Sequence, residues 1–301
     1  MKRWLRIGAW SALGVLLVAG AAFAIVVQLG ERKQHRHVEL AIVPVPYASD
    51  AAAVERGRYL YRSRGCAVCH GAKGAGDDVV NDPGGMLLHA PNITPGAATV
   101  ARYTEVDWVR TIRHGVKPSG EPVMVMPSED FNRFTDADLA AIVAYVRQLA
   151  PAAGAGATIR LPAIVRALYG AGLIPDAAET IDHTLPPSTP VAEGVNEAHG
   201  AYVANACIGC HGASLSGGKV PGGPPDWPPA ANLTPGEGGV LSRYADAQAL
   251  AAMFRSGKRP DGGTVNPAMP FGMLKAMSDV DVQALYLHLK TLPPKATGVG
   301  R

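Results

Sequence analysis

The sequence predicts a mostly α-helical protein in which an N-terminal transmembrane helix precedes two tandem, loop-rich domains of common origin. Three observations support this fold class: an uncharged run near the N-terminus, a block of motifs that recurs after roughly 140 residues, and apolar spacings typical of helices. By residue number we expect an anchor over 1–30, a tether over 31–50, a first domain over 51–150, a linker over 151–190, a second domain over 191–295 and a tail over 296–301.

The composition is unusual for a protein of this length. The 301 residues include 35 glycines and 25 prolines, but only 6% are aromatic, which leaves few large side chains to fill a core. The formal net charge of +3 comes from Lys2, Arg3 and Arg6, because the chain from residue 31 onward carries equal numbers of basic and acidic residues. This neutrality argues against a nucleic-acid-binding protein.

The first predicted element is the membrane helix. No charged residue occurs from Ile7 to Val27, and as a helix this run would be about 31 Å long, against a hydrocarbon core of about 30 Å. A cleavable secretory signal is the alternative, because Ala22-Phe23-Ala24 is a small-x-small site. The apolar run continues beyond that site, which favours an uncleaved anchor. Either interpretation exports the residues that follow it.

All four cysteines lie in two copies of Cys-x-x-Cys-His, the attachment sequence for c-type haem. Two thiols add to the porphyrin vinyl groups, and on a helical turn the following histidine shares their face and can bind the iron. A redox dithiol would not need the histidine, and a Cys2His2 zinc site or a pair of structural disulfides would not explain two copies. The sequence therefore predicts two haem c groups, attached at Cys66, Cys69, Cys207 and Cys210, with His70 and His211 as iron ligands.

The surroundings of the two motifs also repeat. Asn92-Ile93-Thr94-Pro95 recurs as Asn232-Leu233-Thr234-Pro235, and each copy ends in a helix that Thr135 or Ser278 is expected to cap. Shorter helices are predicted over residues 54–64 and 104–115, and a linker helix over 164–174 is expected to pack across the two domains. The Gly- and Pro-rich loops at 74–85 and 217–229 show no strand pattern.

The second axial ligand decides between an electron carrier and an enzyme. Of the methionines, only Met126 and Met269 occupy equivalent positions in the repeat, each followed by proline, and we predict that they bind iron. Core packing is the alternative for any single methionine, and Met124 remains a competitor in the first domain, whereas Met277 is expected to fill the core. The histidines without a counterpart in the repeat are expected at the surface or in the core, with His89 the nearest to a candidate ligand: His89, His114, His183, His199 and His288.

Two arginines recur as well. Arg113 and Arg255 begin the repeated pattern Arg-x-Gly-x-Lys/Arg-Pro-x-Gly. They could pair with haem propionates, or they could lie exposed at the C-terminal ends of helices, where the helix dipole favours a positive charge. The sequence does not distinguish these two interpretations.

The succession of motifs resembles class I c-type cytochromes, and among them the membrane-bound cytochrome c subunits of bacterial periplasmic dehydrogenases for alcohols, gluconate or aldehydes. The resemblance covers both repeats and implies two tandem cytochrome c domains, each a small helical fold around one covalent haem. It implies that Cys66, Cys69, His70 and Met126 hold one haem and that Cys207, Cys210, His211 and Met269 hold the other. Such subunits commonly have three haem domains, whereas this chain has two.

We therefore expect a di-haem electron carrier anchored in the bacterial cytoplasmic membrane, with its haem domains in the periplasm. It would pass single electrons between a dehydrogenase or the quinone pool and a terminal oxidase or soluble cytochrome, without nucleic acid or a small-molecule substrate. The alternative is a di-haem enzyme, either peroxidase-like or thiosulfate-oxidising. A peroxidase needs an iron with a displaceable ligand, and a cysteine-ligated haem would need a fifth cysteine.

Overall fold

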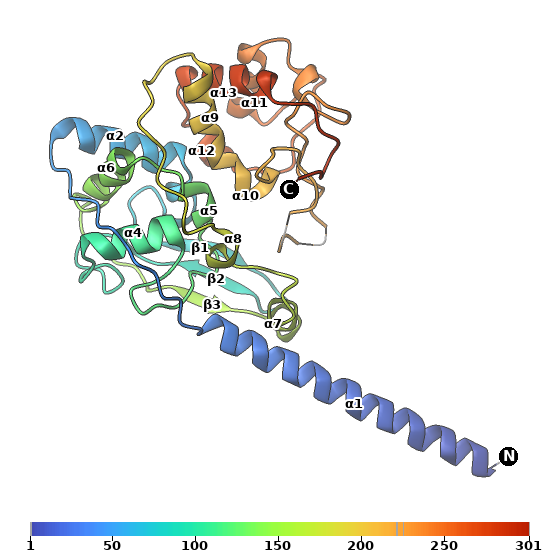
Figure 1. Cartoon of the computed structure of the whole chain (residues 1–301). Helices are drawn as coiled ribbons and strands as arrows, with labels where there is room; N and C mark the ends of the chain where they lie inside the picture. The colour runs from blue at the N-terminus through green and yellow to red at the C-terminus, as the bar shows by residue number, and fades with distance from the viewer. Residues whose placement is uncertain (1, 221, 225, 301) are drawn as a thin grey trace.

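The structure is a computed structural model that describes residues 2–220, 222–224 and 226–300. Met1 and Arg301, the ends of the expected anchor and tail, lie outside the described residues, as do Pro221 and Pro225 in the loop at 217–229. The chain forms one long N-terminal helix and two helical lobes, so the mostly helical fold class is confirmed (Figure 1).

Helix α1 (Lys2–Gln34) extends away from both lobes (Figure 1). Among the described residues it contains the single helical stretch that is long and apolar enough to cross a membrane, Arg3–Gln34, and the apolar window of that stretch has no buried residue. A helix of this kind serves as a signal sequence or as an anchor.

The linker helix α7 (Ala163–Gly170) packs against the C-terminal part of α1. A Cβ at Gly170 would overlap the Val26 carbonyl, so the two helices cross in close contact. Two residues after the end of α1, Arg36 donates two hydrogen bonds to Asp176, at 2.6 and 2.8 Å. The expectation that the linker helix packs across the two domains is therefore wrong, because its buried face is occupied by α1.

The first domain is built on two crossing helices, α2 (Ala51–Ser63) and α6 (Asp136–Val146). They cross at Gly57, where a Cβ would overlap the Ala141 carbonyl. Thr135 caps α6 as expected, since its side chain accepts from the Asp138 amide. The other helices of the domain are α3 (Cys66–His70), α4 (Glu105–His114) and α5 (Ser128–Phe131).

The first domain also contains strands that the sequence pattern did not predict. β1 (Asp77–Asn81) and β2 (Leu87–Ala90) form an antiparallel hairpin, and β3 (Thr158–Arg160) from the linker adds to β2. The expectation of a strand-free loop at 74–85 is wrong here. β1 is almost wholly exposed and β3 is only three residues long, so neither carries the apolar alternation that identifies a strand.

The second domain repeats the helical plan without the sheet, in so far as the structure describes it. Helices α9 (Glu197–Ala204) and α13 (Asp279–Thr291) cross at Gly200, the counterpart of Gly57, and Ser278 caps α13. Between them lie η1 (Asn205–Cys207), α10 (Ile208–His211), η2 (Leu241–Arg243), α11 (Ala247–Ser256) and α12 (Phe271–Leu274). The short helix α8 (Ala177–Thr180) of the linker packs on α5 of the first domain.

The two domains contact each other directly, through equivalent residues. The Tyr59 hydroxyl on α2 donates to Asp281 on α13 at 2.6 Å, and the Tyr202 hydroxyl on α9 donates to Asp138 on α6 at 2.7 Å. Each tyrosine lies two residues after the crossing glycine, and each aspartate lies in the first turn of the terminal helix. The interface therefore has approximate two-fold symmetry.

Candidate functional site

Each Cys-x-x-Cys-His segment forms a single helical turn that a glycine ends. Helix α3 spans the first motif, and η1 with α10 spans the second. Gly71 and Gly212 follow the two histidines with φ of 72° and 78°, in the region that favours glycine. The turn brings both cysteines and the histidine onto one side, as the attachment of one porphyrin requires.

A backbone carbonyl fixes the protonation of both histidines. Nδ1 of His70 donates to the Pro91 carbonyl at 2.9 Å, and Nδ1 of His211 donates to the Ala231 carbonyl at 2.8 Å. Because a carbonyl can only accept, the proton lies on Nδ1 and the lone pair that can bind iron lies on Nε2. Burial lowers the pKa of His70 below its ordinary value, which keeps its imidazole in the neutral, ligating form.

The recurring Asn-x-Thr-Pro motif holds these carbonyls in place. The buried Asn92 side chain accepts from the Thr94 amide and hydroxyl, both at 2.8 Å, and donates to the Ala152 carbonyl at 2.7 Å. Asn232 makes the same contacts with Thr234 and donates to the Lys295 carbonyl at 2.7 Å. The sequence showed that this motif recurs, but it could not show the role, because the atom that holds the histidine is a backbone oxygen.

The two predicted methionine ligands occupy corresponding places. Met126 is partly buried and packs against the core of the first domain together with Cys66, and Met269 does the same with Cys207 in the second. Met277 is 2% exposed within the core of the second domain, which confirms its expected packing role. The structure thus places a thioether and a Cys-x-x-Cys-His turn against one core in each domain.

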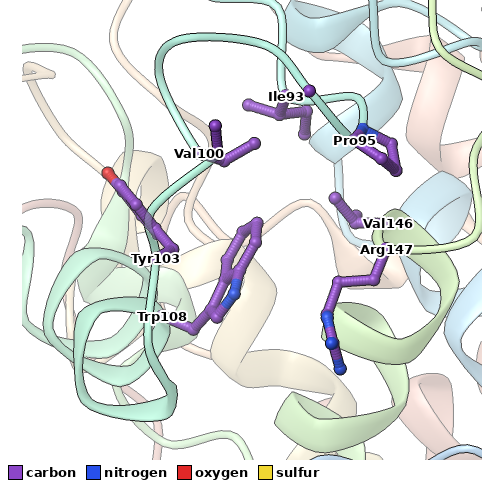
Figure 2. Close-up of a pocket in the computed structure, with 9 residues that line it drawn as sticks. Ile93, Pro95, Val100, Tyr103, Trp108, Val146 and Arg147 are labelled. Atoms are coloured by element: carbon purple, nitrogen blue, oxygen red, sulfur yellow. The ribbon is translucent and has the colours of Figure 1, made fainter.

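A cavity of 270 Å³ lies against this core in the first domain (Figure 2). Ile93, Val100 and Val146 supply apolar walls, and the rings of Tyr103 and Trp108 meet edge to face with centroids 5.0 Å apart. Ile93 belongs to the loop that holds His70, so the cavity adjoins the histidine-bearing side of the core. Arg147 also lines the cavity, whereas Cys66, Cys69, His70 and Met126 do not. The fit to a porphyrin therefore rests on the donor set of two thiols, an imidazole and a thioether.

The cysteines do not suit the alternative chemistries. Burial raises the pKa of the Cys66 and Cys207 thiols to about 12, whereas a redox dithiol needs a lowered pKa. Cys66, Cys69 and Cys207 form no disulfide. Among the residues that the structure describes, no group of three or more His, Cys, Asp or Glu side chains is placed to hold a metal ion such as zinc.

The repeated arginines have a structural role. Arg113 donates to the Phe134 carbonyl and to Asp136, both at 2.9 Å. Arg255 donates to the Met277 carbonyl at 2.8 Å and to Asp279 at 3.1 Å. Both guanidinium groups thus hold the segment that begins the terminal helix of their domain.

Four of the five histidines without a counterpart contact another side chain through a ring nitrogen. His89 pairs with Asp78 across the β1–β2 hairpin at 2.7 Å, and His199 contacts Asp281 at 2.8 Å inside the second domain. His114 and His183 lie with their Nδ1 atoms 3.0 Å apart. His288 is half-buried on α13.

Comparison with known proteins agrees with this geometry. A profile of the cytochrome c family matches residues 54–150 and 195–293. The chain belongs to the cytochrome c family. Its two cytochrome c domains imply two haem c groups, one in each domain.

Curated relatives are cytochrome subunits of dehydrogenases, which confirms the resemblance seen in the sequence. The chain is 25% identical over 283 residues to the fructose dehydrogenase cytochrome subunit of Gluconobacter japonicus, covering 84% of this chain and 55% of that relative. It is 33% identical over 111 residues to the cytochrome c subunit of alcohol dehydrogenase (quinone) from Gluconacetobacter polyoxogenes, covering 35% and 23%. It is 34% identical over 118 residues to the gluconate 2-dehydrogenase cytochrome c subunit of Pantoea cypripedii, covering 37% and 26%. The chain therefore spans about half the length of the first relative, and its matches to the other two cover about a quarter of their lengths.

Proposed function

We propose that this protein is a membrane-anchored di-haem cytochrome c that carries single electrons for a periplasmic dehydrogenase. The observation that supports this most directly is that Met126 packs against the same core as Cys66, and Met269 against the same core as Cys207. In both domains the histidine that follows the cysteines donates from Nδ1 to a backbone carbonyl, so the lone pair that can bind iron lies on Nε2. A haem iron with histidine and methionine as axial ligands changes by one electron between the ferrous and ferric states.

In this proposal Cys66, Cys69, Cys207 and Cys210 hold the two porphyrins covalently. Nε2 of each histidine and the sulfur of Met126 or Met269 complete the iron coordination. Because both axial positions are then occupied, neither domain offers an open position for substrate, and this favours a carrier over a peroxidase-like or thiosulfate-oxidising enzyme.

The dehydrogenase partner is proposed from the relatives, whose names assign them to fructose, alcohol and gluconate dehydrogenases. Helix α1 would anchor the chain in the cytoplasmic membrane and place both domains in the periplasm. The electron donor would be the dehydrogenase or the quinone pool, and the acceptor a terminal oxidase or a soluble cytochrome. Co-purification of a dehydrogenase flavoprotein or quinoprotein with the native complex tests this assignment.

The ligands are tested by substitution. Met126→Leu and Met269→Leu should each abolish the methionine-ligand absorption band of one haem and lower the potential of that haem, because the neutral thioether favours ferrous iron. Met124→Leu and Met277→Leu are matched controls that should leave both bands intact. Survival of the full band in both ligand variants would show that the methionine assignment is wrong.

A further inference from the structure

The domain interface places the segment after each proposed methionine ligand against the haem-attachment turn of the other domain. Helix α5 follows Met126 and Pro127, and it contacts η1 and α10 of the second domain. Helix α12 follows Met269 and Pro270, and it contacts α2 and α3 of the first domain. Figure 1 shows these short helices where the two lobes meet.

The residues at equivalent positions in α5 and α12 differ in charge. Asp130 lies four residues after Met126, and its Oδ1 accepts from the Gly209 amide at 2.7 Å, between Cys207 and Cys210. Met273 lies four residues after Met269, and its sulfur would be 3.3 Å from a Cβ built on Gly65. One attachment turn therefore faces a carboxylate and the other faces an uncharged thioether.

The residues around these positions increase the difference. The neighbour of Asp130 is Glu129, a second acid, whereas the neighbour of Met273 is Gly272. Close to the first attachment turn, the buried Arg64 donates to Asp281 at 2.8 Å, so these two charges offset each other, and the exposed Lys73 lies three residues after His70. The partner of Asp130 is a backbone amide and not a cation, so its charge is left uncompensated by this contact.

The pKa of Asp130 determines the pH at which its charge can be tested. Burial raises the pKa of Asp130 to about 7. Its carboxyl group is therefore ionised in mildly alkaline solution, at about pH 8.5.

We propose that Asp130, supplied by the first domain, holds the reduction potential of the second-domain haem below that of the first-domain haem. Oxidation adds a positive charge at the iron, and a nearby carboxylate stabilises that charge. Electrons then pass from the second domain to the first: the ferrous haem of the second domain is oxidised, the ferric haem of the first is reduced, and no bond or proton is exchanged. This inference rests on the proposed function, in which each domain binds one haem as an electron carrier.

Spectroelectrochemical titration of the full chain in detergent at about pH 8.5 tests the role of Asp130. Asp130→Asn keeps an oxygen that can accept from the Gly209 amide and removes only the charge. The lower of the two waves should rise by at least a tenfold change in its reduction equilibrium, about 59 mV for one electron, while the higher wave stays in place. Asp130→Glu, which keeps the charge, should retain the low wave.

Two further variants make the result specific. Met269→Leu assigns the waves, because it should displace the wave of the second-domain haem. Asp138→Asn removes an interface carboxylate of the same domain that accepts from Tyr202 and Arg56 and does not contact an attachment turn. It should leave the separation of the waves unchanged.

Three results would overturn the inference: Asp130→Asn leaves both waves in place, the displaced wave belongs to the first domain, or Asp138→Asn displaces the wave equally. A lack of two reversible waves in the unsubstituted protein would instead overturn the proposed function, and this inference with it.

Discussion

Tyr59 and Tyr202 join the two domains by equivalent hydroxyl contacts. Each hydroxyl donates to a first-turn aspartate of the opposite domain and accepts a backbone amide there, from Ser278 at 3.0 Å or Thr135 at 3.3 Å. Each tyrosine oxygen thus makes two hydrogen bonds at the N-terminus of the terminal helix of the other domain. Such contacts are made only when the domains are assembled.

Removal of these hydroxyl groups should weaken the interface. Tyr59→Phe and Tyr202→Phe leave Asp281 and Asp138 with one fewer donor, so each should lower the free energy of unfolding by about 1–2 kcal/mol. Limited proteolysis and denaturant unfolding of the double variant measure the effect. Tyr286→Phe is a matched control, because that hydroxyl donates to the Tyr244 carbonyl within the second domain. An interface as protease-resistant in the double variant as in the control would contradict the role of the tyrosines.

Asp281 should make the interface sensitive to acid. Burial alone would raise the pKa of Asp281, but the Arg64 guanidinium and hydrogen bonds from Tyr59 and His199 lower it below the ordinary value. A lowered folded-state pKa gives stability that is present above the ordinary pKa of about 4 and is lost as the pH falls through the folded-state value.

Asp281→Asn removes this stabilisation at neutral pH and leaves Arg64 buried without its anion, at a cost of about 3–5 kcal/mol. Unfolding free energies measured for both proteins should therefore begin to converge as the pH falls below about 4, and they should meet once the pH is below the lowered folded-state pKa of Asp281. A difference that stays constant over this range would show that the pair does not carry the acid sensitivity.

At the residue scale, the repeated motifs of the sequence were sufficient to predict the candidate haem-binding residues. The histidines, cysteines and methionines stand at repeated positions, and so do the residues of Asn-x-Thr-Pro. Asp130 could not be found in this way, because its counterpart is Met273 and its partner Gly209 is distant in sequence. A contact between domains has no signature within either repeat.

Helices were predictable at the scale of elements because their signals are local. The helix expected at 104–115 is observed as α4, which begins after Thr104 with a capping box to Asp107 and ends at Gly115 with φ of 64°. The β1–β2–β3 sheet was missed because β1 is almost wholly exposed and β3 is only three residues long, so neither shows an apolar alternation. The packing of α7 on α1 was also missed, because the sequence of α7 shows an apolar face but does not show which element packs against that face.

Close packing of α7 on α1 can be tested at its crossing glycine. Gly170→Val would place side-chain atoms against the Val26 carbonyl, and overpacking of this kind costs about 1–3 kcal/mol. The linker should then be cleaved faster by protease in detergent. Gly20→Val is the matched control, because a Cβ at that position of α1 meets nothing within 4 Å. Equal cleavage of the two variants would contradict a packed α1–α7 contact.

At the scale of the whole molecule, the composition and the domain arrangement share an explanation. Two porphyrins supply the large apolar surfaces that a chain with 6% aromatic residues lacks, and glycines permit the tight loops that surround them. The repeat predicted two domains, but the relation between them comes from tertiary contacts. The two haem domains contact each other directly through Tyr59 and Tyr202, whereas the linker helix α7 packs on α1.

The central claim is that both domains carry a six-coordinate haem that transfers electrons. The most direct test is to measure haem content and carbon monoxide binding on the purified, reduced full-length protein. We predict two haem c groups per chain and no carbon monoxide adduct, because in the proposed coordination histidine and methionine would occupy both axial positions of each iron. A single haem per chain, or a carbon monoxide adduct at either haem, would contradict the account.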